Sequence, residues 1–576
     1  MSTNGELAHP DEFQRAAVLR SGSDATRYLC VAAHLDDGFA DTVVDRILLD
    51  ELRAVACPVT VNLPVVIRHA LAARRQRRGR DAALAGLLIL TVLLAPIWTL
   101  LLLGIASGSA GMGRRLGRED KPDALSVSGK RVAVMAVTMT SGLLLAVLVR
   151  QGFAGLSGGV SSWLFGTGLT VFLTLCLVVA MYGVVAADLL RKRQVIMRQL
   201  RRSVFDENTS AAEEARPREV GARLDQIRTA EAGNVSAYAD YNPFLGFGGE
   251  VAGWSFALPL YPATDGLREP DSERSVHVEP WDLYQYVRSR LSRLQEVDGT
   301  AAEDPDRLPH LLLEWRVFVS GRALTGHRLL PRRDRAPGVQ LTPEEIRHAA
   351  GDGRGAYRLY LGAHIPSWAG EITASTFLHV STEGRMLYLR CDRRVCGPID
   401  RRYHEVDRLA GGMTAGQRFA LLVQAASEFV GMAFAAPGRT VGSWTGDYNR
   451  AKRLERLRDE AVEDQAFDYG AQVSVTGMAT DSRYQNFFQT VDVDKHLSIV
   501  QRHVLAAILD YLDDHGIDTT EFRNRQLTIL NNGVVQTGGV SMVGAQAVGL
   551  GAQANMAAAA GHGKVQMAGR DQKVAQ

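Results

Sequence analysis

Three long apolar runs stand out in a chain of 576 residues whose remaining sequence mixes polar and apolar positions. The runs cover residues 82–107, 132–149 and 163–187, and we expect the helix of the last run to extend over 163–190. A helix needs about 20 apolar residues to span about 30 Å of hydrocarbon. Each run reaches or nearly reaches this length, which predicts a membrane protein. The shortest run, 132–149, has a buried core helix as its alternative interpretation.

The positions of Lys and Arg predict on which side of the membrane each run begins and ends. Basic clusters precede the first run, separate the first run from the second, and follow the third. The connection at 151–162 is rich in Gly and Ser, with only Arg150 at its edge. Three full crossings would therefore leave at least one basic cluster outside, whereas a first run that re-enters would leave only Arg150 there. Pro96 makes a break in the first run possible, because it removes a helical hydrogen bond.

We therefore expect residues 82–107 to form a re-entrant or kinked segment, followed by two transmembrane helices. A single kinked helix that simply crosses is the alternative. Irregular backbone at membrane depth needs protein or water partners, which the other two runs could supply. The N-terminus lacks a basic segment followed by an apolar core, so no cleavable signal peptide is expected. The chain is thus predicted to be a multi-pass protein of the inner or plasma membrane, with both termini in the cytosol.

The basic segment after the third run predicts contact with anionic lipid head groups, besides its role as a topology signal. Its members are Arg191, Lys192, Arg193, Arg198, Arg201 and Arg202.

The rest of the sequence predicts a cytosolic α+β domain, with helices on an antiparallel sheet. Residues 26–81 are expected to form a small α/β unit, in which TRYLCVAAHL at 26–35 alternates like a strand. A polar linker at 203–223 leads to a β-rich α+β domain at 224–440. Helical patterns at 280–296 and 342–350 interrupt its strands, and Thr342 is suited to cap the second helix.

The later part of the chain has mainly helical patterns, and residues 441–529 are predicted to form a helical region. Just before it, an apolar stretch at 415–436 contains Arg418 and Glu428, which favours a buried or interfacial helix over a fourth membrane span. In LSIVQRHVLAAILDYLDDHGI the apolar residues fall on one helical face, and Gly516 is expected to end that helix. Residues 1–25 are predicted to be disordered, and 530–576 form a Gly/Ala-rich low-complexity tail.

Composition narrows the class of partner. The formal net charge of +2 gives no global field that would favour nucleic acid. The five cysteines have no framework spacing, which suits a reducing compartment. The expected partners are the lipid bilayer, an unidentified protein and further copies of this chain.

Catalytic signatures are missing from the sequence, including the phosphate-binding loop, the HExxH zinc motif and the nucleophile elbow. GFGGEVAG at 246–253 departs from GxGxxG and is better suited to a turn. The acidic turn at 34–41 contains His34, Asp36, Asp37 and Asp41, which could ligate a metal, although Asp is also common in turns and helix caps.

Cys391 and Cys396 lack the second thiol pair of a zinc site. We therefore predict no catalytic residue, cofactor or metal. Scattered histidines such as His364, His379 and His404 leave an unrecognised active site open.

The stretch YNPFLGFGGEVAGWSFALPL concentrates the aromatic residues Tyr241, Phe244, Phe247 and Trp254. These side chains are suited to the core of the sheet or, alternatively, to a partner-binding surface. Over residues 235–440 the sequence resembles uncharacterised membrane-anchored proteins of high-GC bacteria, a resemblance that implies membrane anchoring and no particular activity.

The tail at 528–556 has regularly spaced glycines and almost no charge. Its VVQTG segment resembles bacterial amyloid-signalling motifs through Val534, Val535, Gln536 and Gly538, and departs from a related motif in having Thr537. This resemblance implies self-association through stacked β structure, whereas a disordered low-complexity tail is the alternative.

Together these features favour a membrane-anchored, cytosol-facing scaffold or sensor that binds a protein partner and self-associates through its tail. One alternative is a conflict or cell-death effector that permeabilises the membrane when the tail assembles. A membrane-bound enzyme with an unrecognised site is the second alternative.

Overall fold

The computed structural model describes residues 23–94, 168–206, 218–263, 277–295, 306–353, 355–408, 413–481 and 483–531. The chain divides into two compact units, Met1–Phe522 and Arg523–Gln576. Several predicted features lie outside the described residues: the break at Pro96, the run at 132–149, and the tail residues Val534, Val535, Gln536 and Gly538.

The first unit contains a six-stranded sheet with the strand order β1-β3-β4-β5-β6-β2. The strands are β1 Val235–Tyr238, β2 Gly249–Pro259, β3 Leu312–Ser320, β4 Tyr357–Ser367, β5 Ile372–Glu383 and β6 Met386–Cys396. Four of the five pairings are antiparallel, but β1 pairs with β3 in parallel. The α+β prediction is confirmed, and the antiparallel sheet is corrected to a mixed one. The connection from β1 to β3 passes through β2 and a helix, and a parallel pair needs such a long connection.

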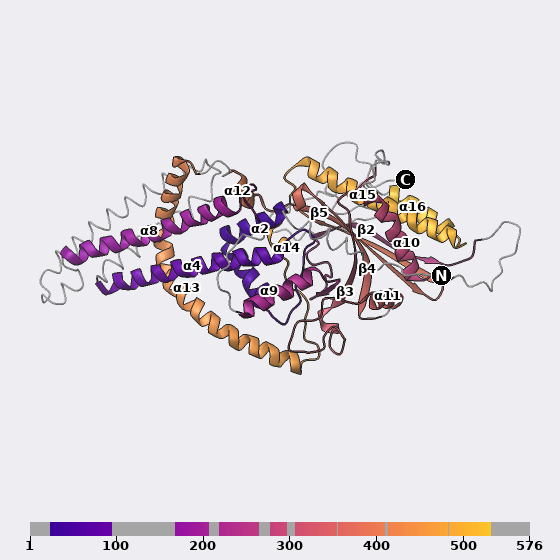
Figure 1. The fold of residues 1–576 in the computed structure, drawn as a ribbon, viewed down its shortest axis with the longest axis horizontal. Helices are drawn as coiled ribbons and strands as arrows, with labels where there is room; N and C mark the ends of the chain where they lie inside the picture. The colour runs from indigo at the N-terminus through magenta and orange to yellow at the C-terminus, as the bar shows by residue number, and fades with distance from the viewer. Residues whose placement is uncertain are drawn as a thin grey trace, which may run out of the picture. The chain divides into compact units, whose positions relative to one another are not determined.

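Helices cover one face of the sheet (Figure 1). They are α10 Pro280–Ser292, α11 Pro343–Gly351 and α15 Phe487–Asp514. Trp281 of α10 packs on Trp315 of β3, with ring centroids 5.1 Å apart. Leu497 of α15 packs with Ala374 of β5 in one core cluster. The predicted cap is confirmed, because Thr342 forms a capping box with Glu345.

The predicted end of α15 is confirmed as well. Gly516 lies two residues beyond the helix with a φ of 65°, a left-handed conformation that glycine adopts at low cost.

Residues 23–94 are described throughout and contain no strand. They form α2 Asp24–Leu35, α3 Asp37–Thr42, the π-helix η1 Val43–Leu48 and the long α4 Leu63–Leu94. The predicted strand at 26–35 and the α/β character of residues 26–81 are therefore wrong. Every residue from Ala25 to His34 is buried, so α2 has no exposed face that would reveal helical periodicity.

Two further long helices pack against α4, namely α8 Gly168–Gln199 and α13 Ala415–Glu463. Leu88 of α4, Val185 of α8 and Phe429 of α13 share one buried apolar cluster. In Figure 1, α4 and α8 lie side by side and α13 runs across both. The apolar stretch at 415–436 and the charged segment after it thus form one helix, which continues through Pro437.

The remaining helices of the described residues are shorter. They are α9 Arg218–Glu231, α12 Glu405–Arg408, α14 Val475–Ala479 and α16 Thr520–Asn531, together with single 3-10 turns at Arg293–Gln295, Gly321–Ala323, Trp368–Gly370 and Arg401–His404.

Candidate functional site

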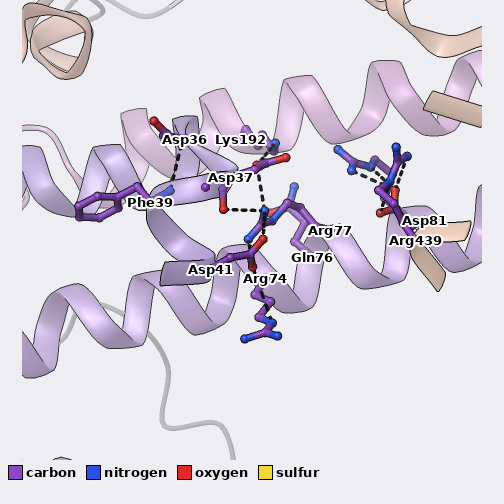
Figure 2. Close-up of polar contacts among 12 residues, drawn as sticks. Asp36, Asp37, Phe39, Asp41, Arg74, Gln76, Arg77, Asp81, Lys192 and Arg439 are labelled. Atoms are coloured by element: carbon purple, nitrogen blue, oxygen red, sulfur yellow. Dashed lines mark hydrogen bonds and ion pairs between the residues drawn. The ribbon is translucent and has the colours of Figure 1, made fainter. Parts of the chain in front are cut away.

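A cluster of buried and half-buried charges lies where α3, α4, α8 and α13 meet, next to the apolar cluster of the long helices (Figure 2). We call this cluster the junction. It comprises Asp37, Asp41, Arg77, Arg80, Asp81, Asp188, Lys192 and Arg439.

Arg77 joins α4 to α3 within the junction. Its guanidinium donates two parallel hydrogen bonds to the Asp41 carboxylate, at 2.9 and 3.2 Å, and a third to the Asp37 carbonyl oxygen at 3.0 Å. Such bidentate pairs fix orientation as well as distance. Lys192 of α8 lies 3.5 Å from the Asp37 carboxylate, so α3 is held from both long helices (Figure 2).

Asp81 joins α4 to α13. Its carboxylate accepts hydrogen bonds from Arg439 of α13 at 2.9 and 3.1 Å (Figure 2). It also accepts hydrogen bonds from Arg80 at 3.0 Å. Arg80 also donates to Asp188 of α8 at 3.1 Å. One chain of charged hydrogen bonds therefore connects three helices, and two of its members, Asp81 and Arg439, are 358 residues apart in sequence.

Further ion pairs extend the junction along α13. Arg78 donates two bonds of 2.9 Å to Asp447, and Arg450 bridges Asp447 and Asp45 at 2.7 and 3.1 Å. These outer groups are more exposed, so each pair contributes little stability by itself.

Each buried charge of the junction has a partner of opposite charge. Burial by itself lowers the pKa of Arg80, but Asp81 and Asp188 outweigh it and raise that pKa above its ordinary value. Replacing such an ion-pair network by apolar groups often costs nothing, whereas removing one partner costs several kcal/mol. The junction is therefore suited to fixing the register of the helices more than to adding net stability.

An open cleft of about 460 Å³ runs along the junction between α3, α4 and α13. The arginines that line it, Arg74, Arg77, Arg78, Arg80 and Arg439, each contact a carboxylate. Because these cations are already paired, the cleft offers a second anion little attraction. In the described part of the chain, no group of three His, Cys, Asp or Glu side chains is placed to hold a metal ion.

The acidic turn that could have ligated a metal belongs to this network instead. Asp36 caps α3 by accepting a hydrogen bond from the Phe39 amide at 3.0 Å, as the capping interpretation predicts (Figure 2). Asp37 and Asp41 pair with Arg77.

His34 contacts a second buried imidazole, with its Nε2 3.1 Å from Nδ1 of His69 in α4. Burial lowers the pKa of His34 to about 4, with a contribution from Lys192. Burial and the neighbouring His34 lower the pKa of His69 to about 3. The other ring nitrogens, Nδ1 of His34 and Nε2 of His69, are buried and have no hydrogen-bond partner among the described residues. With both pKa values this low, the two rings are neutral at pH 7.

The basic segment, which begins in α8 and extends past its end at Gln199 to Arg202, divides into two groups. Lys192 pairs with Asp37, Arg193 with Glu405 at 2.7 Å, and Arg202 with Asp24 at 3.0 Å. Arg191 and Arg198 are exposed, while Arg201 is half-buried. Head-group contact stays a prediction, and the exposed pair is best placed for it.

The aromatic partner-surface candidates also separate. Phe244 and Phe247 are buried and pack with Phe318 and Phe377 of the sheet. Trp254 is half-buried and stacks on Phe256 at 5.4 Å. Tyr241 is 95% exposed, so the structure leaves it available as a surface residue.

A buried polar row across the sheet escaped the sequence analysis. His364 of β4 contacts Ser375 of β5 through Nδ1 at 2.9 Å and Glu314 of β3 through Nε2 at 3.0 Å. Burial by itself raises the pKa of Glu314, but Arg316 and His364 outweigh it and hold the pKa well below its usual value. Strand register creates the row, because His364 pairs with Ser375 across β4 and β5.

The row resembles a catalytic relay in composition but not in access. Ser375 and His364 are both fully buried, and Phe247 stacks on the imidazole with ring centroids 5.5 Å apart. A nucleophile must reach its substrate. The row is therefore a structural network in this conformation.

The sequence model of the AbeC-like domain matches residues 253–543. The matched stretch begins within β2 and includes β3–β6 and α10–α16, so it contains α13 but neither α4 nor α8. No curated protein and no solved structure matches the chain.

Proposed function

The chain belongs to the AbeC-like family, and we propose that it is a membrane-anchored scaffold or sensor whose α+β domain faces the cytosol and binds a protein partner. The junction carries this proposal, because it connects the apolar helices to the rest of the first unit through charged hydrogen bonds. The proposal has two aspects with separate support: anchoring in the membrane, and mechanical coupling of the apolar helices to the rest of the first unit.

Anchoring is supported by apolar surface that the protein itself leaves uncovered. Phe172–Gln199 within α8 and Ala415–Glu463 are long and apolar enough to span a membrane, and only 28% of the most apolar window of each is buried. Leu93 of α4 and Val179 of α8 are large apolar side chains that are exposed. Burial of such surface is worth about 25 cal/mol per Å², so lipid would cover it favourably.

Coupling is supported by the position of α13. This helix contacts α4 and α8 through Phe429 and Arg439. In chain order it follows β6 and α12 and precedes α14. A shift of α8 relative to α4 would break the contact between Arg80 and Asp188 or would carry α13 with it. Such a connection suits a sensor that transmits a change at the membrane, or a scaffold that holds its domain in one orientation.

Reporter fusions and extraction test the anchoring and its orientation in the full-length chain. We expect the protein to stay in the membrane pellet after alkaline carbonate extraction. A periplasmic reporter is expected to be active after Gly158 and inactive after Gly113. Activity after Gly113 would show that the first apolar run crosses, and release by carbonate would reject anchoring altogether.

A further inference from the structure

In the described part of the chain, one face of α13 is uncovered near Phe419 and again from Val441 to Tyr448, whereas Val430 and Phe434 between them pack against the apolar cluster of the long helices. Apolar residues follow each other on this side at intervals of three or four, with one step of seven between Phe434 and Val441: Phe419, Val423, Ala426, Val430, Phe434, Val441, Trp444 and Tyr448. We call this set the α13 stripe. Residues three, four or seven apart lie on the same side of a helix, so all members of the stripe share one side of α13. Phe419 and Trp444 are 68% and 72% exposed.

The opposite flank of α13 faces the junction. Gln424, Glu428 and Met432 line a cavity together with His34, Asp37 and Lys192. Arg439 binds Asp81 on the same flank. The stripe therefore points away from the charged junction, toward the side on which α4 and α8 continue as apolar helices.

Those continuing helices are exposed and apolar on the same side. Ile89 and Leu93 of α4 and Phe172 and Val179 of α8 are large exposed side chains. The α13 stripe thus extends an apolar surface that already includes the ends of both long helices. We propose that α13 lies in the plane of the membrane surface and that its stripe inserts between lipid head groups and acyl chains. This proposal rests on the proposed membrane anchoring and adds a specific lipid-contact surface to it.

The residue types along the stripe fit that depth. Trp and Tyr are enriched at membrane interfaces, where an apolar ring and a polar tip are both accommodated. Lys452 lies over the Tyr448 ring, with its Nζ 4.6 Å from the centroid, and its position suits an ammonium that reaches head groups. An amphipathic helix with basic and aromatic residues is the usual form of an interfacial helix.

The length of α8 agrees with a position of α13 at the membrane surface. The helix α13 meets α8 near Met181 and Val185, where Tyr182 donates a hydrogen bond to the Leu422 carbonyl oxygen at 3.2 Å. The described part of α8 before this contact, from Gly168 to Met181, measures about 20 Å. This length fits within the hydrocarbon thickness of about 30 Å.

Site-specific photo-crosslinking tests the proposal in the full-length chain, reconstituted in vesicles of phosphatidylethanolamine and phosphatidylglycerol. The photoreactive residue p-benzoylphenylalanine replaces Trp444 or Phe419 in the stripe, Gln424 on the opposite flank, or Leu175 in α8. All four side chains are exposed, so the replacements leave no cavity. Lipid adducts are then measured by mass spectrometry of the digested protein.

We expect lipid adducts at Trp444, Phe419 and Leu175, and no lipid adducts at Gln424. Adducts at Leu175 without adducts at Trp444 and Phe419 would overturn the interfacial helix and leave the anchoring intact. No adduct at Leu175 would overturn both. Adducts of Trp444 or Phe419 to a protein, including a second copy of this chain, would show that protein covers the stripe and would likewise overturn the proposal.

Discussion

Asp81 is the residue on which the junction converges, because its buried carboxylate accepts hydrogen bonds from both Arg80 and Arg439. We expect Asp81→Ala to lower the free energy of unfolding by about 3 kcal/mol, since it leaves buried cationic groups short of a partner. The matched control is Asp447→Ala, which removes an exposed partner of Arg78 and should cost less than about 1 kcal/mol. Chemical denaturation in detergent micelles measures both. Equal losses would contradict the special role of Asp81.

At the scale of single residues, the pair of His34 and His69 also predicts how the free energy of unfolding depends on pH. Both pKa values are lowered in the folded state, to about 4 and about 3, so the unfolded chain binds more protons below about pH 6.5. Stability is therefore fully present above that pH and is lost as the pH falls toward 4, by at most about 1.4 kcal/mol per pH unit for each histidine.

Thermal unfolding at pH 7 and pH 5 measures this effect. The double variant His34→Gln with His69→Gln should lose less stability between the two pH values than the unmodified chain does. A variant of the exposed His277 serves as the control and should behave like the unmodified chain. An unchanged pH dependence in the double variant would assign the loss to other groups.

At the scale of single elements, exposure decided which predictions succeeded. The apolar face of α15 was predicted because its other face is exposed and polar, and Leu497, Val504 and Ile508 are indeed buried. The sequence of α2 favours a strand over a helix, because burial on all sides leaves no polar periodicity. For α13 the apolar stretch and the two internal charges favoured a buried or interfacial helix, and the structure buries only one face of it.

The junction itself was out of reach of sequence reasoning. The arginines at 74–80 predict only a topology signal, Asp37 and Asp41 only a turn, a helix cap or metal ligands, and Asp81 and Asp188 carry no sequence signal of their own. Contacts such as that between Arg439 and Asp81 depend on how distant helices cross, and no local pattern encodes this crossing. Charge balance between the basic flank and the acidic turn at 34–41 was the one available hint.

Strand packing around His364 gives a prediction for β4. A Cβ added at Gly362 would lie 2.7 Å from the His364 Nε2 and 3.2 Å from the Glu314 Cγ. Gly362→Ala should therefore displace the imidazole from Glu314 and lower the free energy of unfolding by about 1–3 kcal/mol. Gly249→Ala in β2 is the control, because nothing lies within 4 Å of its added Cβ. If the two variants are equally stable, the close packing at Gly362 is not limiting.

At the scale of the whole molecule, anchoring makes a prediction about replacing exposed apolar side chains by Arg. The effect on membrane association should depend on where in the chain the side chain lies more than on how exposed it is. Leu175 and Val179 of α8 are 57% and 60% exposed, and Phe487 and Phe488 at the start of α15 are 67% and 62% exposed. The first pair belongs to the apolar run expected in the bilayer, where each Arg costs about 2.5–3.5 kcal/mol near the centre. The second pair belongs to the domain expected in the cytosol, where Arg is well solvated.

We therefore expect Leu175→Arg with Val179→Arg to shift the full-length chain out of the carbonate-resistant membrane fraction. Phe487→Arg with Phe488→Arg should leave that fraction unchanged, although it replaces side chains that are at least as exposed. Quantitative immunoblotting of pellet and supernatant measures the distribution. If both double variants leave the pellet to the same extent, the loss does not depend on the position of the replaced side chains, and membrane insertion of α8 does not account for it. If neither does, α8 does not hold the chain in the membrane, and the junction then couples helices of another kind.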